Sequence, residues 1–178
     1  MKTFIALLRG INVSGQKKVP MAQLRSLLAN SGFKNVQTYI QSGNVIFQTL
    51  EENKSELENI IQNSIFSHFG FDVSVLVRTP LNIQNILDVC PFSEDKKINS
   101  YFTLLHSNPD ISLMDETSVI SYPDEEFHIT NSCVYFFSSN GYGNAKCNNN
   151  FFERKLKVTA TTRNYKTMVK LLSLCAEN

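Results

Sequence analysis

Three short polar segments carry the side chains of this chain that could bind or transform a ligand. The first is Arg9–Gly15, which closes an apolar run and opens a loop, and the others are Gln41–Asn44 and Thr161–Thr167. Guanidinium donors beside several amides suit a phosphate, a carboxylate or the edge of a nucleobase. A fourth segment, Ser138–Cys147, is rich in glycine and contains one lysine. These residue types predict a ligand site, but they do not define a reaction.

The candidate ligand-binding residues fall into two groups, and neither group includes a predicted catalytic residue. They are Arg9, Asn12, Gln41, Ser42 and Asn44 in the first group, and Lys146, Arg163 and Asn164 in the second. Asn164 would open the last helix, whose free N–H groups and dipole favour an anion. A structural alternative stays open for both groups. Asn12 would then cap its own loop, Arg9 would meet a surface carboxylate, and Asn164 or Thr162 would only cap the helix.

Other arrangements that could support catalysis or bind a metal are sparse. The pattern Gly141-x-Gly143-x-x-Lys146 lacks the ending of a P-loop and the third glycine of a dinucleotide fingerprint. The four cysteines show neither a CxxC pair nor zinc spacing, so we expect reduced thiols. The three adjacent carboxylates of Asp124–Glu126 are expected to face water. The sequence therefore predicts no metal site and no cofactor.

The composition is that of an ordinary globular protein, with 178 residues of which 42% are hydrophobic and 19% charged. A net charge of +1 provides no long-range field toward nucleic acid or an anionic membrane. No apolar run approaches the roughly 20 residues that span a bilayer, and no signal-peptide pattern is present. We expect a cytoplasmic protein with no membrane and no nucleic acid among its partners.

Hydrophobic periodicity predicts the elements that must position these residues. In the first half, strands are expected at 3–8, 36–41, 45–49 and 73–78, with helices at 20–28 and 54–69. The second half begins with a linking helix at 81–90. It then repeats the order, with strands at 101–106, 126–130, 133–138 and 158–162 and helices at 110–119 and 148–155, and it ends with a further helix at 165–176. Each half has the order βαββαβ, the split βαβ or ferredoxin-like unit.

The predicted fold is α+β, with two ferredoxin-like (alpha-beta plait) units packed together and a C-terminal helix. The expected units span residues 1–79 and 80–178. Both faces of the first strand are apolar, whereas a sheet with helices on one face only should show one polar face. The free faces are therefore expected to cover each other, and a homodimer is the competing explanation.

The strand order also predicts which loops meet. In a split βαβ unit the first two strands run parallel, so the loop Arg9–Lys18 should lie beside the hairpin Gln41–Asn44. By the same logic, the glycine-rich loop should bring Lys146 to a cluster with Thr162, Arg163 and Asn164. The topology is also that of an RNA-binding RRM. However, the third strand lacks the RRM's aromatic stacking pair, which leaves RNA binding with less support.

Three motifs resemble those of a bacterial family known as domain of unknown function 1697. They are Arg9–Val13 with Met21 and Leu24, then Tyr39–Phe47, then Thr162–Thr167, and the resemblance covers essentially the whole chain. It implies two alpha-beta plait units and no established activity.

The chain departs from the family's usual residues at three places. They are Ser14, where glycine is usual, Ala145, where serine commonly precedes the lysine, and Tyr165, where tryptophan is frequent. The missing hydroxyl at Ala145 weakens any role of that loop as a nucleophile or metal ligand.

Three functional hypotheses follow. The leading one is a protein that binds a small anionic or nucleotide-like ligand through the Arg-, Asn- and Gln-rich loops. The second is an enzyme of unknown reaction that uses the same loops to stabilise a transition state. The third is a protein-interaction or dimerisation module, and both a monomer and a homodimer stay open.

Overall fold

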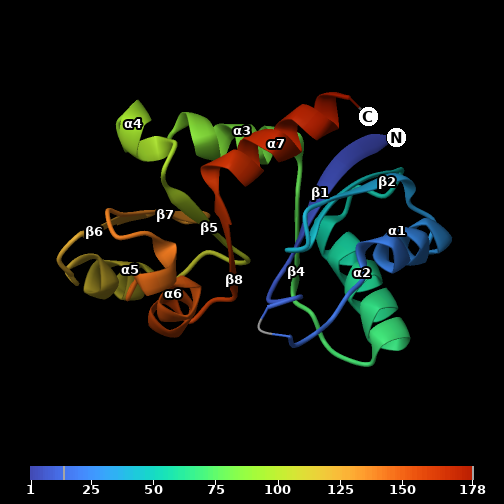
Figure 1. Ribbon diagram of the computed structural model, residues 1–178, viewed down its shortest axis with the longest axis horizontal. Coiled ribbons are helices and arrows are strands. Elements are labelled where there is room, and N and C mark those ends of the chain that lie inside the picture. Colours follow the sequence, from blue (N-terminus) through green and yellow to red (C-terminus); the bar gives the residue numbers. More distant parts are fainter. Residues whose placement is uncertain (14, 178) are drawn as a thin grey trace. The chain divides into compact units, whose positions relative to one another are not determined.

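The computed structural model describes residues 1–13 and 15–177, and Ser14 of the first motif lies outside them. Within the described residues the strands form two four-stranded antiparallel sheets. Their strand orders are β2-β3-β1-β4 and β6-β7-β5-β8, and Figure 1 shows where the two sheets lie along the coloured chain. Both orders are those of the ferredoxin-like unit, which confirms the predicted α+β fold.

The elements of the first half are β1 (Lys2–Leu8), α1 (Met21–Asn30), β2 (Lys34–Tyr39), β3 (Asn44–Thr49), α2 (Lys54–Phe69) and β4 (Val75–Arg78). Those of the second half are α3 (Pro80–Asp88), α4 (Glu94–Lys97), β5 (Tyr101–Leu105), α5 (Ile111–Ser118), β6 (Glu125–Ile129), β7 (Cys133–Ser138), the 3-10 helix η1 (Tyr142–Asn144), α6 (Asn149–Leu156), β8 (Ala160–Asn164) and α7 (Tyr165–Ala176). The structure adds α4 and η1 to the predicted elements. No helix of the described chain has the length and apolar character needed to cross a membrane.

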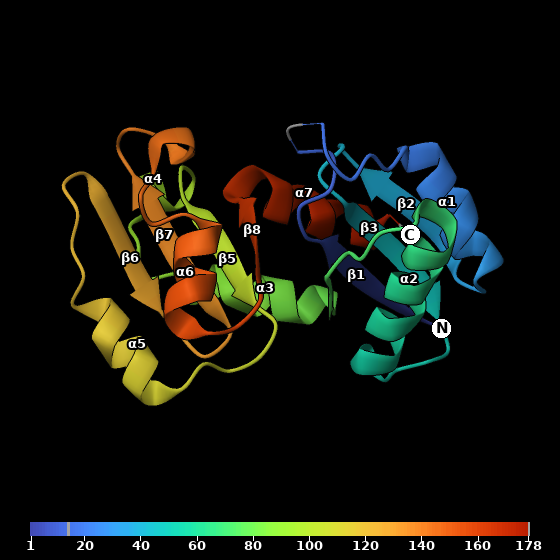
Figure 2. The ribbon, with the colours of Figure 1, turned by 90° about the horizontal axis from the view of Figure 1, so that it is seen from below.

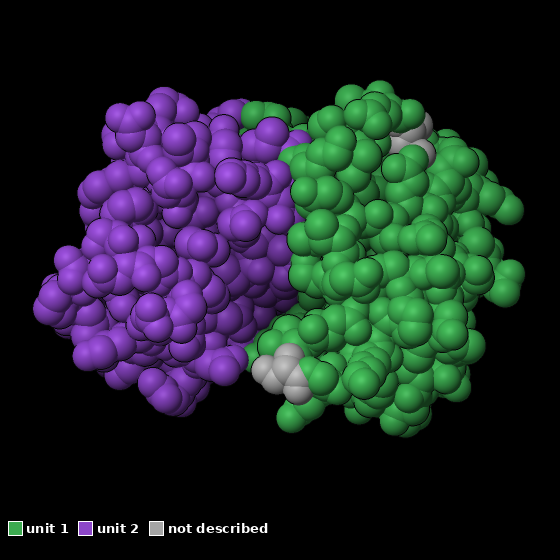
Figure 3. All heavy atoms as spheres, in the orientation of Figure 1, with its two compact units in different colours: residues 1–84, 170–178 green, residues 85–169 purple. Residues whose placement is uncertain are grey.

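The chain divides into two compact units, coloured separately in Figure 3. The first comprises residues 1–84 and 170–178, and the second comprises residues 85–169. Both divisions fall inside helices, since α3 and α7 each contribute residues to both units. The boundary expected between residues 79 and 80 lies at the start of α3.

In the first unit, α1 and α2 lie side by side on one face of the sheet (Figure 2). Their apolar residues recur every three or four positions, so one stripe of each helix is buried. That stripe meets the rings of Phe33 and Phe47, whose centroids are 4.5 Å apart. The predicted bounds of α2 are confirmed, because Asn53 accepts hydrogen bonds from the N–H groups of Ser55 and Glu56, and Gly70 ends the helix with a φ of 80°.

In the second unit, α5 and α6 pack against each other, and they contact the edge strands β6 and β8 respectively. The core is aromatic, as the thirteen phenylalanines of the chain suggest. Phe152 is fully buried and meets Phe127 and Phe136 edge-on, with ring centroids 5.2 and 6.4 Å away. Asn148 starts α6 by accepting a 3.1 Å hydrogen bond from the N–H of Phe151.

In both units a glutamate of the preceding helix accepts a hydrogen bond from the outermost strand, β4 or β8. In the first unit, Glu58 of α2 accepts a 2.8 Å hydrogen bond from the backbone N–H of Val77. In the second, Glu153 of α6 accepts a 2.9 Å bond from the N–H of Ala160. An edge strand otherwise presents its N–H groups to water or to another chain. The helix that precedes each edge strand thus satisfies one of them.

Candidate functional site

The first rim is the end of the first sheet where the loop after β1 lies beside the β2–β3 hairpin. The N–H of Leu8 donates a 2.8 Å hydrogen bond to the carbonyl of Gly43, and the side-chain amide of Asn12 donates a 2.8 Å bond to the carbonyl of Gln41. The parallel course of β1 and β2 predicts this juxtaposition, and the contacts confirm it. The rim thus consists of residues 9–19 and 40–43 of the described chain.

Asn12 joins the two segments of the rim. Its Nδ2 donates to the carbonyls of Gln41 and Val19 at 2.8 and 3.0 Å, and its Oδ1 accepts from the N–H of Val19 at 2.9 Å. Its φ of 54° is one that asparagine tolerates better than most residues. The amide is therefore occupied in holding the loop, as the structural alternative predicts. This places Asn12 in a positioning role.

Asn44 and Gly43 fix the hairpin. Asn44 is fully buried, and its Nδ2 donates to the carbonyl of Tyr39 and to the hydroxyl of Ser42 at 3.0 and 2.9 Å. A Cβ on Gly43 would lie 2.6 Å from the Cβ of Leu8 and 2.9 Å from the Cδ1 of Ile11. Only glycine fits so close an approach with a φ of 79°. The hairpin is therefore packed tightly against the end of β1.

The outward surface of the rim is cationic and polar. Lys17, Lys18 and Gln41 are exposed, and the ammonium of Lys17 donates a 2.5 Å hydrogen bond to the carbonyl of Asp72. Arg9 follows β1 directly and is half-buried. The two segments contain no Asp or Glu, although Asp72 lies on the neighbouring loop. The rim thus combines three cations with an exposed amide.

The exposed part of the rim also carries two apolar side chains, which the sequence analysis did not single out. Val13 and Ile40 are 58% and 50% exposed, and they flank the hydrogen bond between Asn12 and Gln41. Ile40 has a φ of 50°, a rare conformation for a β-branched residue. An anion held here would have apolar surface within reach.

The second group of candidate residues is spread along an edge of the second sheet. Lys146 lies over the ring of Tyr122, 5.2 Å from its centroid, and its backbone N–H donates to Glu125 at the start of β6. Arg163 and Asn164 end β8, and β7 and β5 separate β8 from β6. Three strand spacings amount to about 14 Å. Among the described residues no contact joins Lys146 to Arg163. The residues of the expected cluster are therefore spread across the width of the sheet, from β6 to β8.

Arg163 and Asn164 both have structural contacts. Arg163 is 8% exposed, and its Nη1 donates a 2.9 Å hydrogen bond to the carbonyl of Thr162. Burial lowers the pKa of its guanidinium to about 10. The Oδ1 of Asn164 accepts a 2.9 Å bond from the N–H of Thr167 in the first turn of α7. Asn164 therefore caps that helix, as the alternative interpretation predicts.

A hydrogen-bonded network around Tyr142 anchors the glycine-rich loop. The ring of Tyr142 stacks on Tyr101 with centroids 4.5 Å apart, and its hydroxyl accepts a 2.9 Å bond from the N–H of Asn149. Thr162 donates to the Oδ1 of Asn149 at 2.9 Å and lies 2.8 Å from the hydroxyl of Thr103. Burial raises the pKa of the Tyr142 hydroxyl. The tyrosine, rather than the lysine, joins this loop to β8.

The acidic segment Asp124–Glu126, at the start of β6, also has structural partners. Glu125 accepts hydrogen bonds from the N–H groups of Lys146 and Cys147 at 2.7 and 2.9 Å, and Glu126 pairs with the ammonium of Lys96 at 2.5 Å. The expectation that all three carboxylates face water is therefore wrong for Glu125, whereas the Glu126 side chain is 43% exposed and pairs with Lys96 at the surface. Among the described residues, no group of three or more His, Cys, Asp or Glu is arranged to hold a metal. All four cysteines are free thiols.

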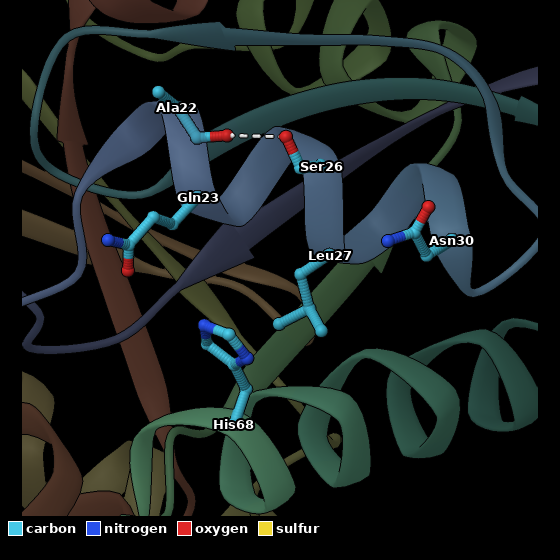
Figure 4. A pocket seen from close by; sticks show the side chains of 6 residues that line it. All are labelled: Ala22, Gln23, Ser26, Leu27, Asn30 and His68. Carbon is cyan, nitrogen blue, oxygen red and sulfur yellow. Dashed lines mark hydrogen bonds between the residues drawn. The ribbon is translucent and has the colours of Figure 1, made fainter.

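A groove between α1 and α2 is a candidate site that the sequence analysis missed. A hollow of about 470 Å³ lies here, and the side chains that line it are Ala22, Gln23, Ser26, Leu27, Asn30 and His68. Figure 4 shows these six residues. The imidazole of His68 points from α2 toward α1, between Gln23 and Leu27 (Figure 4). The only signal in the sequence is the lack of charge along these helix faces.

Comparison with known proteins places the fold but names no activity. A solved structure, of a conserved bacterial protein from Streptococcus pneumoniae, has a TM-score of 0.76 and 25% sequence identity over 97% of this chain and 98% of its own. The comparison with curated proteins gives no match. A family model described as protein of unknown function, DUF1697, matches residues 1–135, which contain the first two of the three motifs. The chain therefore belongs to the DUF1697 family of proteins of unknown function.

Proposed function

We propose that this is a cytoplasmic protein that binds a small anionic or nucleotide-like ligand at the first rim. One observation carries the proposal. The loop with Arg9, Lys17 and Lys18 is closed by two hydrogen bonds between Asn12 and Val19 and is held against the hairpin by a third, from Asn12 to Gln41, and neither segment contributes a carboxylate. A loop whose backbone is fixed before binding loses less entropy when a ligand arrives. The four free thiols are consistent with a reducing compartment.

The rim residues divide into binding and positioning roles. Arg9 and Lys18 would bind the charge, and the exposed amide of Gln41 would bind a polar edge of the ligand. Asn12 and Asn44 hold the backbone, because their own amides are already bonded within the rim. Ser42 accepts a hydrogen bond from Asn44 and thereby supports the hairpin.

For the second group, ligand binding stays a prediction. Lys146, Arg163 and Asn164 each have a structural contact in the described chain. Lys146 lies beside β6, whereas Arg163 and Asn164 lie on β8, about 14 Å away across the sheet.

The expected affinity follows from the number of contacts. A hydrogen bond to a charged group contributes about 1.5–3 kcal/mol, and exposed pairs fall at the low end. Two contacts of about 2 kcal/mol, or three of about 1.8 kcal/mol, sum to roughly 4–5.5 kcal/mol, which corresponds to a Kd of about 0.1–1 mM. A ligand at about 10 mM would then stabilise the protein by roughly 1.4–2.7 kcal/mol. For a chain of this size the melting temperature should rise by about 3–10 °C.

The test is a thermal-shift panel of inorganic phosphate, nucleotides, sugar phosphates and carboxylates, followed by titrations with any ligand that raises the melting temperature. Lys18→Gln should weaken binding several-fold. Its matched control is Lys34→Gln, since Lys34 is also an exposed lysine and lies at the opposite end of the same sheet. The proposal fails if no panel member stabilises the protein, or if both variants bind equally well.

A further inference from the structure

The groove between α1 and α2 is longer than the hollow in Figure 4 alone. A second hollow, lined by Leu27, Asn63, Ser64, Ser67 and His68, shares two residues with the first. The two hollows therefore form one groove. Its α1 wall carries Gln23, Ser26 and Asn30, and its α2 wall carries Asn63, Ser64, Ser67 and His68. A hollow of about 470 Å³ lies in the size range of small-molecule sites.

The walls of the groove carry no formal charge. Arg25 is the one charged residue of α1, and its Nη1 donates a 2.6 Å hydrogen bond to Thr38 of β2. In α2 the charged residues are confined to Lys54–Glu58, and residues 59–67 contain none. Solvent-facing helix surfaces usually carry Lys and Glu. A ligand of this groove is therefore selected by hydrogen bonding and shape instead of by charge.

The polar side chains of the walls have hydrogen-bonding capacity left over. Within the described part of the chain, Gln23, Asn30, Asn63 and Ser67 make no side-chain hydrogen bond to another residue. The hydroxyl of Ser26 donates to a carbonyl of the preceding helical turn at 3.2 Å, and its oxygen can still accept. The hydroxyl of Ser64 is bonded to the carbonyl of Ile60 and to Ser31, at 2.7 and 2.9 Å. The groove thus offers both donors and acceptors on both walls.

The floor is apolar and the walls are fixed. Leu27 is half-buried, lies between the polar walls in both hollows and packs against the core below. The hydroxyls of Ser31 and Ser64 meet at 2.9 Å and tie α1 to α2 next to the groove. Side chains on two packed helices are held more firmly than side chains on loops. This combination suits a ligand with an apolar face and many neutral hydroxyls.

We propose that this groove binds a neutral polyhydroxylated ligand, namely an oligosaccharide of two or more sugar rings. Sugar hydroxyls both donate and accept, as the amides, hydroxyls and imidazole of the walls require. The C–H face of one ring would pack on Leu27 and Ala22. The joined hollows accommodate more than one ring. This site is separate from the first rim, and neither proposal depends on the other.

The test is an NMR titration of the 15N-labelled full chain with neutral di- and trisaccharides of glucose, mannose, galactose and N-acetylglucosamine. At least one sugar should shift the amide signals of Gln23, Leu27, Asn63 and His68 with a saturable curve. The proposal is overturned if none of them does so. It is equally overturned if these signals shift with protein concentration alone, because the groove would then be an interface between copies.

Isosteric variants provide the matched comparison. Asn63→Asp replaces a wall amide by a carboxylate without changing its size, and it should weaken sugar binding about tenfold by leaving a desolvated charge. Asn59→Asp makes the same change on α2 outside the groove and should bind as the parent does. Lys18→Gln in the rim should also leave sugar binding unchanged. Equal weakening by Asn63→Asp and Asn59→Asp would contradict the assignment of this groove.

Discussion

The tight contact between the β2–β3 hairpin and the end of β1 can be measured by replacing Gly43 with alanine. The added Cβ would lie 2.6 Å from the Cβ of Leu8, an atom that no side-chain rotation can move, and 2.9 Å from the end of Ile11. Overpacking of this kind costs about 1–3 kcal/mol. The φ of 79° adds roughly 1–2 kcal/mol for any L-residue. We therefore expect Gly43→Ala to lower the free energy of unfolding by about 2–5 kcal/mol.

Gly70→Ala is the matched control for this variant. Gly70 has a φ of 80°, no atom lies within 4 Å of a Cβ placed there, and it belongs to the same unit. Backbone strain and the entropy of the unfolded chain therefore affect both variants alike. The difference between their free energies of unfolding measures the steric clash at Gly43. Urea unfolding at constant m should show Gly43→Ala less stable than Gly70→Ala by about 1–3 kcal/mol. Equal losses would refute the close packing of the rim.

Three further variants test other contacts. Asn12→Gly keeps the left-handed backbone but removes the three hydrogen bonds of the Asn12 side chain. Urea unfolding should therefore show a free energy of unfolding that is lower by about 2 kcal/mol. An unchanged free energy would contradict the positioning role of Asn12. Lys96 holds the pKa of the Glu126 carboxyl below 4.5, so this contribution to stability is present above pH 4.5 and disappears as the pH falls through the native pKa. In Lys96→Gln the carboxyl, followed by NMR, should titrate at higher pH, and an unchanged midpoint would exclude the pair. Tyr135→Phe removes a buried 3.0 Å hydrogen bond to the carbonyl of Ile86. Thermal unfolding should show a stability lower by about 1 kcal/mol. An unchanged melting temperature would count against that hydrogen bond.

The sequence predicts most elements here because their ends carry recognisable signals. α2 and α7 begin and end at the predicted residues, with Gly70 ending α2 and Asn164 capping α7. α4 has only four residues and no apolar periodicity, so no pattern could reveal it. Ile40 adopts a left-handed backbone that its β-branched side chain disfavours, and only the tertiary structure imposes it.

The candidate site is less predictable, because an asparagine amide binds a ligand and a backbone carbonyl with the same chemistry. The sequence indicates correctly that Asn12 lies beside Gln41, but it leaves open whether the amide faces outward. The same holds for Asn164, whose side chain caps α7. The sequence predicts Arg163 as a ligand-binding cation. In the sheet, Arg163 pairs with Phe102 of β5, and only 8% of its surface is exposed. Side-chain direction at a strand end depends on register, which the motif alone does not contain.

The carboxylates that cover the outer strands have a consequence for local motion. Edge strands usually open independently of the rest of a sheet, and their outward N–H groups exchange with solvent quickly. Val77 and Ala160 are bonded instead to Glu58 and Glu153 on the preceding helices. Opening either strand at these positions requires the helix to release it, so strand and helix become one unit of local unfolding. The slow-exchanging part of each sheet should therefore extend to its outermost strand.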